Sequence, residues 1–503
     1  MQAKLLKNPL FLFYILLALL SCWPVLNHDF FPTMDGPAHL YNAQLIKSLW
    51  LGTESLQDYF LFNPEPIPNW TGHGILAGLL TLGVPPELAE KTLLLIICLG
   101  LPFAFFILVT TINNGNLHPL SILILPFIYT FLLALGFYNF SLGLVCFLFA
   151  LNQWYLWLKK PSFSNGLLLF LFVGLTYFSH VLPFVFLCLS SGIIYLLERN
   201  KAPLKTESIL LAKTILLFSP FLFLFIRFYF SRKGVDTSTY LPLEELLSMI
   251  YHMRALVVYN FDEEWYTYVL ASVIGLILII QATQIKRASI AKHLSLIILT
   301  VLSLLLLFII PDGNSGGSYV SQRISLFFFL YLILLCCRLP FKLITAPLIV
   351  IFIGAHFYLV KFYNTVIYDL NVFAHDVVAA GSLIPEGSSI APIHSSYNWL
   401  SPHFSNYLGI SKPVVVLENY EASTDYFPLT WNYDALPNFS LAANACRPWE
   451  SNADGPILKP DYISIIGKKP LEACDSLLQK SITEDYILLT DKNTFIKLYE
   501  IKK

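Results

Sequence analysis

The residues best suited to chemistry stand together just after the first apolar segment. The stretch DFFPTMDGPAHLYNAQLIKSL, residues 29–49, contains Asp35 and His39. The Gly36-Pro37 pair breaks the chain, and a helix can begin there with the proline in its first turn. Asp35 would then stand at the helix N-terminus, where aspartate often caps exposed backbone N–H groups. The same carboxylate could instead act as a general base that takes a proton from a hydroxyl or an amine.

His39 follows Asp35 by four residues and could orient an acceptor or bind a phosphate, although a lone histidine is more often structural. Asp35, His39 and His73 share the first polar loop and could converge on a metal ion. Their spacing matches no recognised ligand pattern. We therefore predict no metal centre and no cofactor, with a divalent ion left open as an alternative.

The elements that position these residues are predicted to be membrane helices. The chain has 503 residues, of which 56% are hydrophobic and 13% charged, and its mean hydropathy is +0.66. Because a soluble domain carries about a quarter charged residues, this composition predicts an integral membrane protein. The net charge of −1 gives no indication of a nucleic-acid partner.

Eleven segments are predicted to cross the bilayer, which takes about 20 apolar residues. They are 9–27, 90–111, 118–135, 138–158, 164–180, 181–198, 207–230, 265–284, 290–311, 320–338 and 342–360. The first lacks a small-residue cleavage site after it and is interpreted as an uncleaved helix. Segment 71–84 is apolar but short, and we expect a helix that lies on the outer face or dips into it.

Basic residues set the predicted orientation, because loops rich in lysine and arginine stay in the cytoplasm. Lys4 and Lys7 place the N-terminus inside, and Lys159-Lys160 marks a later cytoplasmic turn. The first outer loop and the cytoplasmic turn at Lys159-Lys160 lie on opposite sides, so an odd number of crossings must separate them. Segments 90–111, 118–135 and 138–158 give that odd number, and counting 71–84 as a further span would make it even. The C-terminus is then outside, with large outer loops at 28–89 and 231–264. A bacterial inner membrane is the expected location.

The chain becomes polar after residue 360. Residues 361–503 predict a small soluble α/β domain on the outer face, and residues 1–360 the membrane domain. The predicted strands of the soluble domain are Ser389–Ile393, Pro413–Leu417, Tyr462–Ile466, Tyr486–Leu489 and Phe495–Tyr499, with a short helix at Leu471–Gln479. Cys446 and Cys474 could form a disulfide there if the domain is outside the cytoplasm; the sequence leaves this open.

Two arginines near the outer ends of spans are candidate phosphate ligands. Arg254 lies in the amphipathic segment 241–258, and Arg323 lies in the first turn of the tenth span. Charge at membrane level is costly and so marks a functional candidate, and guanidinium binds phosphate through paired hydrogen bonds. A salt bridge to a loop acid such as Asp312 is the alternative for Arg323.

Two tight turns face the same side as these loops in the predicted topology. Tyr138 and Asn139 lie in the first turn and His180 in the second. The three side chains could line the floor of a cavity. Hydrogen bonding at helix ends is the more frequent role for such residues.

This arrangement resembles the GT-C-type glycosyltransferases, which include the protein O-mannosyltransferases and the lipid A aminoarabinose transferases. The shared pattern is a large first outer loop with an acid near its start, short inner loops, a second outer loop after the seventh span and a soluble C-terminal domain. The resemblance implies an inverting transfer of sugar from a polyprenyl-phosphate-linked donor to a glycan, lipid or protein acceptor. It assigns the catalytic role to Asp35 and phosphate contacts to Arg254 or Arg323. The acid that often follows the catalytic aspartate in mannosyltransferases is absent, since Gly36 stands there.

Two other functions remain alternatives. A lipid or sugar transporter or flippase would place polar groups near the bilayer midplane and often shows inverted repeats, whereas these spans have few midplane charges and no visible repeat. A non-catalytic membrane assembly protein would use the outer domain for binding, and a sealed, packed outer face would indicate it.

Overall fold

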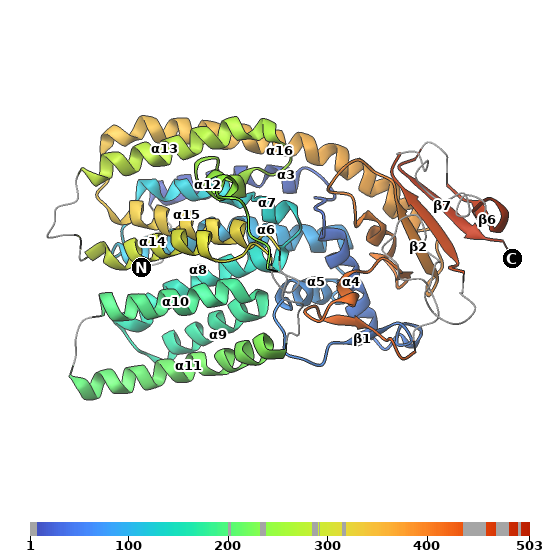
Figure 1. Ribbon diagram of the computed structural model, residues 1–503, viewed down its shortest axis with the longest axis horizontal. Coiled ribbons are helices and arrows are strands. Elements are labelled where there is room, and N and C mark those ends of the chain that lie inside the picture. The colour runs from blue at the N-terminus through green and yellow to red at the C-terminus, as the bar shows by residue number, and fades with distance from the viewer. Residues whose placement is uncertain are drawn as a thin grey trace. The chain divides into compact units, whose positions relative to one another are not determined.

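The computed structural model describes residues 8–199, 203–231, 238–283, 290, 292–313, 318–435, 459–468, 482–490 and 494–502. The chain is mostly helical and divides into two compact units (Figure 1). The helical unit comprises Met1–Pro24, Leu95–Ala134 and Asn139–Asn364, and the mixed unit comprises Val25–Leu94, Leu135–Tyr138 and Thr365–Lys503. The whole of the predicted outer loop 28–89 thus groups with the C-terminal residues.

Seven helices in the described part of the chain are long and apolar enough to cross a membrane, which makes the protein a multi-pass integral membrane protein. They are Pro86–Ile112 (α6), Tyr138–Lys159 (α8), Val181–Glu198 (α10), Leu204–Ser231 (α11), Phe261–Ala282 (η4 and α13), Val320–Arg338 (α15) and Leu343–Gly381 (η6 and α16). Shorter apolar helices occupy the other predicted spans: Pro9–Ser21 (α2), Pro119–Ala134 (η2 and α7), Phe163–Ser179 (α9) and Leu294–Ile309 (α14). The count of eleven spans, and the side on which each loop lies, stay predictions.

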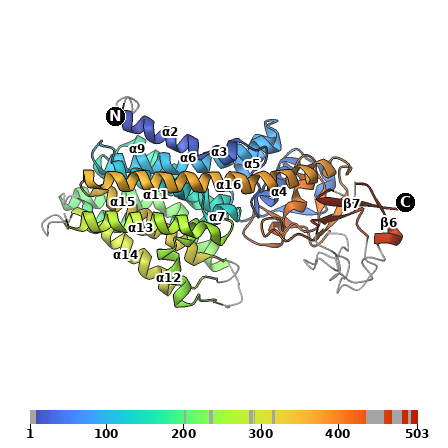
Figure 2. The ribbon, with the colours of Figure 1, turned by 90° about the horizontal axis from the view of Figure 1, so that it is seen from above.

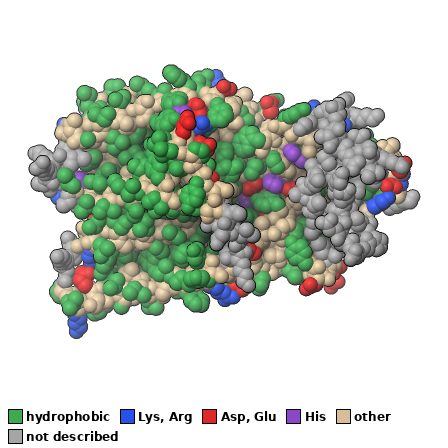
Figure 3. Space-filling view, in the orientation of Figure 1, with side chains coloured by type: hydrophobic (Ala, Val, Ile, Leu, Met, Phe, Trp, Pro, Cys, Tyr) green, Lys and Arg blue, Asp and Glu red, His purple; other side chains and the backbone are tan. Residues whose placement is uncertain are grey.

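The helical unit has buried and exposed helices. Helix α8 is buried over 83% of its most apolar stretch and α15 over 72%, whereas α11 is buried over only 17%. Helix α9 packs against α10 and α11, and α14 packs against α15. Figure 2 shows the helices of the chain from a second direction. Hydrophobic side chains cover much of the face of these helices in Figure 3, as expected of a surface that contacts lipid.

Two predicted helices differ from the structure. Segment 118–135 is not one α-helix, because its first part is the 3₁₀-helix η2 (Pro119–Ile128) and only Phe131–Ala134 (α7) is α-helical. Pro126, inside this segment, lacks the N–H group that an α-helix needs, whereas Pro119 stands in the first turn, where proline is tolerated. Helix α16 (Ala346–Gly381) continues for 36 residues, well past the predicted end at residue 360. Its length of about 54 Å exceeds the roughly 30 Å of a hydrocarbon core.

The mixed unit contains a five-stranded sheet, counted over the described residues, in the order β3-β2-β5-β7-β6. Its strands are Ser389–His394 (β2), Val415–Val416 (β3), Tyr462–Ile466 (β5), Tyr486–Leu488 (β6) and Ile496–Ile501 (β7). Strand β2 is parallel to β3 and β5, and β7 is antiparallel to β5 and β6. All five predicted strands are therefore confirmed. The predicted helix Leu471–Gln479 and the cysteine pair Cys446 and Cys474 lie outside the described residues.

Helix α4 (Gly36–Trp50) is the central helix of the mixed unit and is buried along most of its length. It packs against α5 (Thr71–Thr81), the predicted surface helix, and against the 3₁₀-helix η7 (Phe404–Gly409). The Tyr41 hydroxyl donates to the carbonyl of Val414 (2.8 Å) and accepts from the N–H of Val416 (3.0 Å). A short ladder, β1 (Phe60–Phe62) with β4 (Leu429–Trp431), also joins the first loop to the C-terminal residues.

Candidate functional site

Asp35 occupies the N-cap position of α4, as predicted, but its carboxylate does not cap the helix. Among the described residues its side chain makes no capping hydrogen bond. Thr33 caps the start of the helix instead, because its Oγ1 accepts a hydrogen bond from the N–H of Gly36 (3.0 Å). The capping interpretation of the Asp35 side chain is therefore wrong, and the carboxylate remains available for other contacts.

The backbone of Asp35 is held by the turn at Gly136. The N–H of Asp35 donates to the carbonyl of Leu135 (3.1 Å). Gly136 has φ +85, and a Cβ atom at this position would lie 2.7 Å from the Asp35 nitrogen. Only glycine fits both the left-handed conformation and the close approach.

The Asp35 carboxylate is surrounded by a histidine and a tyrosine from the C-terminal residues. Its Oδ1 lies 3.6 Å from Nε2 of His403, and the Tyr420 hydroxyl donates a hydrogen bond to it. The residue is only 6% exposed. Burial raises the pKa of Asp35 above the usual range, and the attraction of His403 and His39 offsets this only in part. A carboxylate with a raised pKa is a stronger base than an ordinary aspartate.

His403 is itself held by Glu418. Its Nδ1 lies 2.5 Å from Oε1 of Glu418, whose other oxygen accepts hydrogen bonds from Ser405 (2.7 Å) and Asn406 (2.9 Å). Burial lowers the pKa of His403, but the charge of Glu418 and its hydrogen bond, together with Asp35, raise it more, so the net direction is upward. The imidazole is thereby favoured as a cation between two carboxylates.

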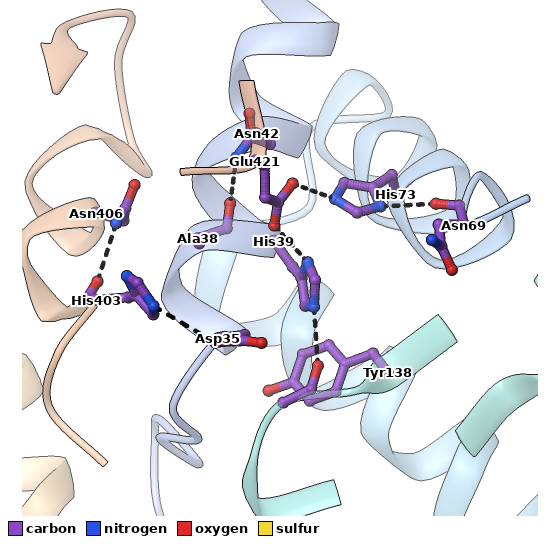
Figure 4. Close-up of polar contacts among 12 residues, drawn as sticks. Asp35, Ala38, His39, Asn42, Asn69, His73, Tyr138, His403, Asn406 and Glu421 are labelled. Carbon is purple, nitrogen blue, oxygen red and sulfur yellow. Dashed lines mark hydrogen bonds and ion pairs between the residues drawn. The ribbon is translucent and has the colours of Figure 1, made fainter. Parts of the chain in front are cut away.

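His39 lies one turn along α4 and joins a second cluster (Figure 4). Its Nε2 donates to the carbonyl of Gly136 (2.8 Å), and its Nδ1 lies 2.6 Å from Oε1 of Glu421. Nε2 of His73 lies 2.8 Å from the other Glu421 oxygen. Burial lowers the pKa of His39, but Glu421 raises it above the ordinary value. The two histidines in turn outweigh burial at Glu421 and lower its pKa to about 2.

Tyr138 completes the part of the predicted site that lies in the mixed unit. Its hydroxyl donates to Glu90 (2.8 Å) and accepts from Thr33 (3.0 Å). Its ring lies 5.4 Å from that of His39, between centroids. The structure thus brings Asp35, His39 and Tyr138 together.

The other predicted site residues belong to the helical unit. Arg323 contacts Nε2 of His180 (3.3 Å) and lies over the Phe140 ring, 5.6 Å from its centroid. His180 also caps α10, since its Nδ1 accepts the N–H of Leu182 (3.1 Å), which is the helix-end role weighed for it. Asn139, the residue that precedes Phe140, is buried.

Arg254 forms an ion pair with Glu264 at 2.7 Å and stacks over the Phe261 ring at 4.9 Å. This salt bridge to a loop acid accounts for its charge without an outside anion. The predicted site residues therefore divide between the two units.

Sequence reasoning missed His403, Glu418, Tyr420 and Glu421. All four follow the carboxyl ends of two neighbouring parallel strands, since His403 comes after β2 and the others come after β3. Ligand-binding and catalytic residues of α/β sheets gather at that edge. The sequence signal that could have pointed to these four residues was the polar segment after each of the strands predicted at Ser389–Ile393 and Pro413–Leu417.

A pocket of about 680 Å³ lies in the helical unit, at the ends of α6, α10 and α15. Its lining includes Asn113, His118, Glu198 and Arg338. The site residues predicted from the sequence, all of which are described in the structure, do not line this pocket. By the predicted topology this end of the helices faces the cytoplasm.

No protein-family model and no curated protein matches the chain. Solved structures do match: the arabinofuranosyltransferase AftD from Mycobacteria superposes with a TM-score of 0.50 over 98% of this chain, at 12% sequence identity. The chain spans only 40% of the length of that protein. At this identity the likeness concerns the fold alone. The resemblance to the fold of the GT-C-type glycosyltransferases, predicted from the loops, is thereby confirmed.

Proposed function

We propose that this protein is a membrane glycosyltransferase that moves a sugar from a polyprenyl-phosphate-linked donor to an acceptor at the outer face. Asp35 is the general base. The observation that carries the proposal is the state of its carboxylate: it is buried, unused for capping among the described residues, and paired with His403. Such perturbed carboxylates gather at functional sites. The fold likeness to an arabinofuranosyltransferase supports the same class of reaction.

The proposed reaction is a single displacement. Asp35 takes the proton of an acceptor hydroxyl as the acceptor oxygen bonds to the anomeric carbon of the sugar. The bond from that carbon to the phosphate oxygen breaks, its electron pair leaves with the polyprenyl phosphate, and the configuration at carbon inverts. His403 is a positioning residue, because its cation favours the ionised form of Asp35 and fixes its orientation.

The departing phosphate needs a positive partner. The sequence-based candidates for this role are in the helical unit, where Arg323 contacts His180. Arg254 is the weaker candidate of the two arginines, because Glu264 already neutralises it at 2.7 Å. Tyr138, in the same unit as Asp35, would help to line the acceptor site.

The experiment that tests this function uses the purified full chain in lipid nanodiscs with a panel of polyprenyl-phosphate-linked sugars. We expect release of polyprenyl phosphate from one donor in the presence of a hydroxyl acceptor, and inversion of the anomeric configuration in the product. Movement of intact donor across the bilayer without cleavage would contradict the proposal and favour the flippase alternative. Retention of configuration would contradict the single displacement.

A further inference from the structure

Three buried side chains in the mixed unit have the composition of a metal centre. His39 from α4, His73 from α5 and Glu421 from η8 (Glu421–Ser423) place one ligand atom each within 4.8 Å of one another. They are at most 4% exposed. Two imidazoles and one carboxylate are the ligands of many zinc sites, whereas Mg²⁺ and Ca²⁺ prefer oxygen ligands throughout. We propose that His39, His73 and Glu421 bind one Zn²⁺ ion.

The backbone contacts of the two imidazoles orient them toward this centre. Nε2 of His39 donates to the carbonyl of Gly136 (2.8 Å), and Nδ1 of His73 donates to the carbonyl of Asn69 (3.1 Å). In the neutral ring only one nitrogen carries a proton, so each contact leaves a lone pair on the inner nitrogen. A backbone carbonyl that accepts the outer N–H is the usual support of a metal-binding histidine (Figure 4).

The inner atoms of the cluster depend on one another for a partner: Nε2 of His73 and Nδ1 of His39 each face one oxygen of Glu421. Nδ1 of His39 and Oε1 of Glu421 are buried and 2.6 Å apart, and among the described residues neither has a hydrogen-bond partner besides the other. With the imidazoles neutral, two electron-rich atoms at this separation repel, and either a proton or a metal cation between them removes the repulsion. A buried carboxylate also needs a positive partner, because removing an ion from water without one is costly. A divalent cation would supply that partner and use both lone pairs.

The residues around the three ligands favour a structural zinc site, in which the ion is closed off from solvent and stabilises the fold. The Phe427 ring lies 6.0 Å from that of His39 and 5.7 Å from that of His73, between centroids. The two imidazole rings stand nearly perpendicular, at 88°. The ion would join α4, α5 and the segment after β3, and would fix the turn of α4 that follows Asp35. This inference does not rest on the proposed function, because metal content can be measured without any transfer assay.

The test is metal analysis of the purified full chain. We expect about one Zn²⁺ per wild-type chain, and less than about 0.1 in His73→Gln and in Glu421→Gln. The matched control is His403→Gln, which removes a buried histidine that also pairs with a glutamate, and it should keep its zinc. Zinc retained by both His73→Gln and Glu421→Gln, or lost equally from the control, would overturn the proposal.

A second measurement on wild-type protein avoids variants that fail to fold. Zinc removed with a chelator should lower the melting temperature by several degrees, and Zn²⁺, but not Mg²⁺, should restore it. Co²⁺ added to the stripped protein should give the visible absorption bands of a tetrahedral site with nitrogen ligands. A wild-type chain that binds less than about 0.1 Zn²⁺ after this addition, with an unchanged melting temperature, would show that the cluster is a histidine–carboxylate ion pair instead.

Discussion

The imidazole of His403 lies with its Nε2 3.6 Å from Oδ1 of Asp35. This relationship joins the first polar loop to the C-terminal residues of the chain. Because Glu418 holds the other ring nitrogen at 2.5 Å, the histidine is fixed on both sides. The carboxylate that the sequence singled out is thus oriented by a residue that the sequence did not single out.

His403→Gln should lower kcat by about 10-fold to 100-fold with little change in KM, since a positioning contact is lost but no substrate contact. The cation of His403 lowers the pKa of Asp35, so its removal raises that pKa further. Activity falls as pH drops through the pKa of the base, and the acid limb of the pH–rate profile should therefore move to higher pH. The control is His375→Gln, a half-exposed histidine that pairs with Asp29. An unmoved acid limb would contradict the role of His403.

Protonation of His403 should also stabilise the fold. Its pKa is raised in the folded state because Glu418 and Asp35, with a smaller effect of Glu421, outweigh burial; His394 is the nearby group that opposes the charge. The stability is fully present below the unfolded pKa of about 6.5 and is lost as pH rises through the higher folded pKa. The melting temperature of wild type should exceed that of His403→Gln most at acidic pH, and the gap should narrow above neutrality. A gap that widens with pH would contradict this sign.

Gly136→Ala should destabilise the protein more than Gly52→Ala. Both glycines have a positive φ, +85 and +81, but only Gly136 faces a crowded neighbour, the Asp35 nitrogen at 2.7 Å. Left-handed strain alone costs about 1–2 kcal/mol, and the overpacking should add about 1–3 kcal/mol. Denaturant titration in mild detergent measures both variants. Equal losses would show that the turn relaxes without moving Asp35.

Tyr41→Phe should cost about 1–3 kcal/mol of unfolding free energy, because the buried Val414 carbonyl and Val416 N–H both lose their hydrogen bond to the hydroxyl. Tyr433→Phe is the control, since that side chain is exposed. If the two variants unfold alike, α4 is not anchored to β3 through this hydroxyl.

The strands and the helix at Asp35 could be predicted because their signals are local. Tyr462–Ile466 is a short β-branched run between turns, and Gly36-Pro37 starts a helix wherever it lies. The end of α16 was missed because the fall in hydropathy after residue 360 marks a change of surroundings and not of secondary structure. Buried residues continue along its one face at helical spacing: Tyr363, Ile367, Leu370, Ala374 and Val377.

The site could be predicted only in part. Asp35, His39 and Tyr138 could be named as candidates from the sequence because they lie at or near turns beside apolar segments, and the structure places them close together. His403 and Glu421 contact residues that are far away in the chain, and the parallel pairing of β2 with β3 brings their loops to one edge of the sheet. No local pattern shows that pairing. From the sequence, Asp35, His39 and His73 form a possible metal set, but no metal centre is predicted. In the structure the two histidines cluster with Glu421 and not with Asp35.

The most direct test of the central claim compares sugar transfer by Asp35→Asn with that by Asp29→Asn. Asp29 is a matched control, because it is an exposed aspartate in the same loop. Both variants are assayed for release of polyprenyl phosphate at equal amounts of folded protein. We predict a loss of about 10²-fold to 10⁴-fold for Asp35→Asn and wild-type turnover for Asp29→Asn. Wild-type turnover by a folded Asp35→Asn protein would contradict the account.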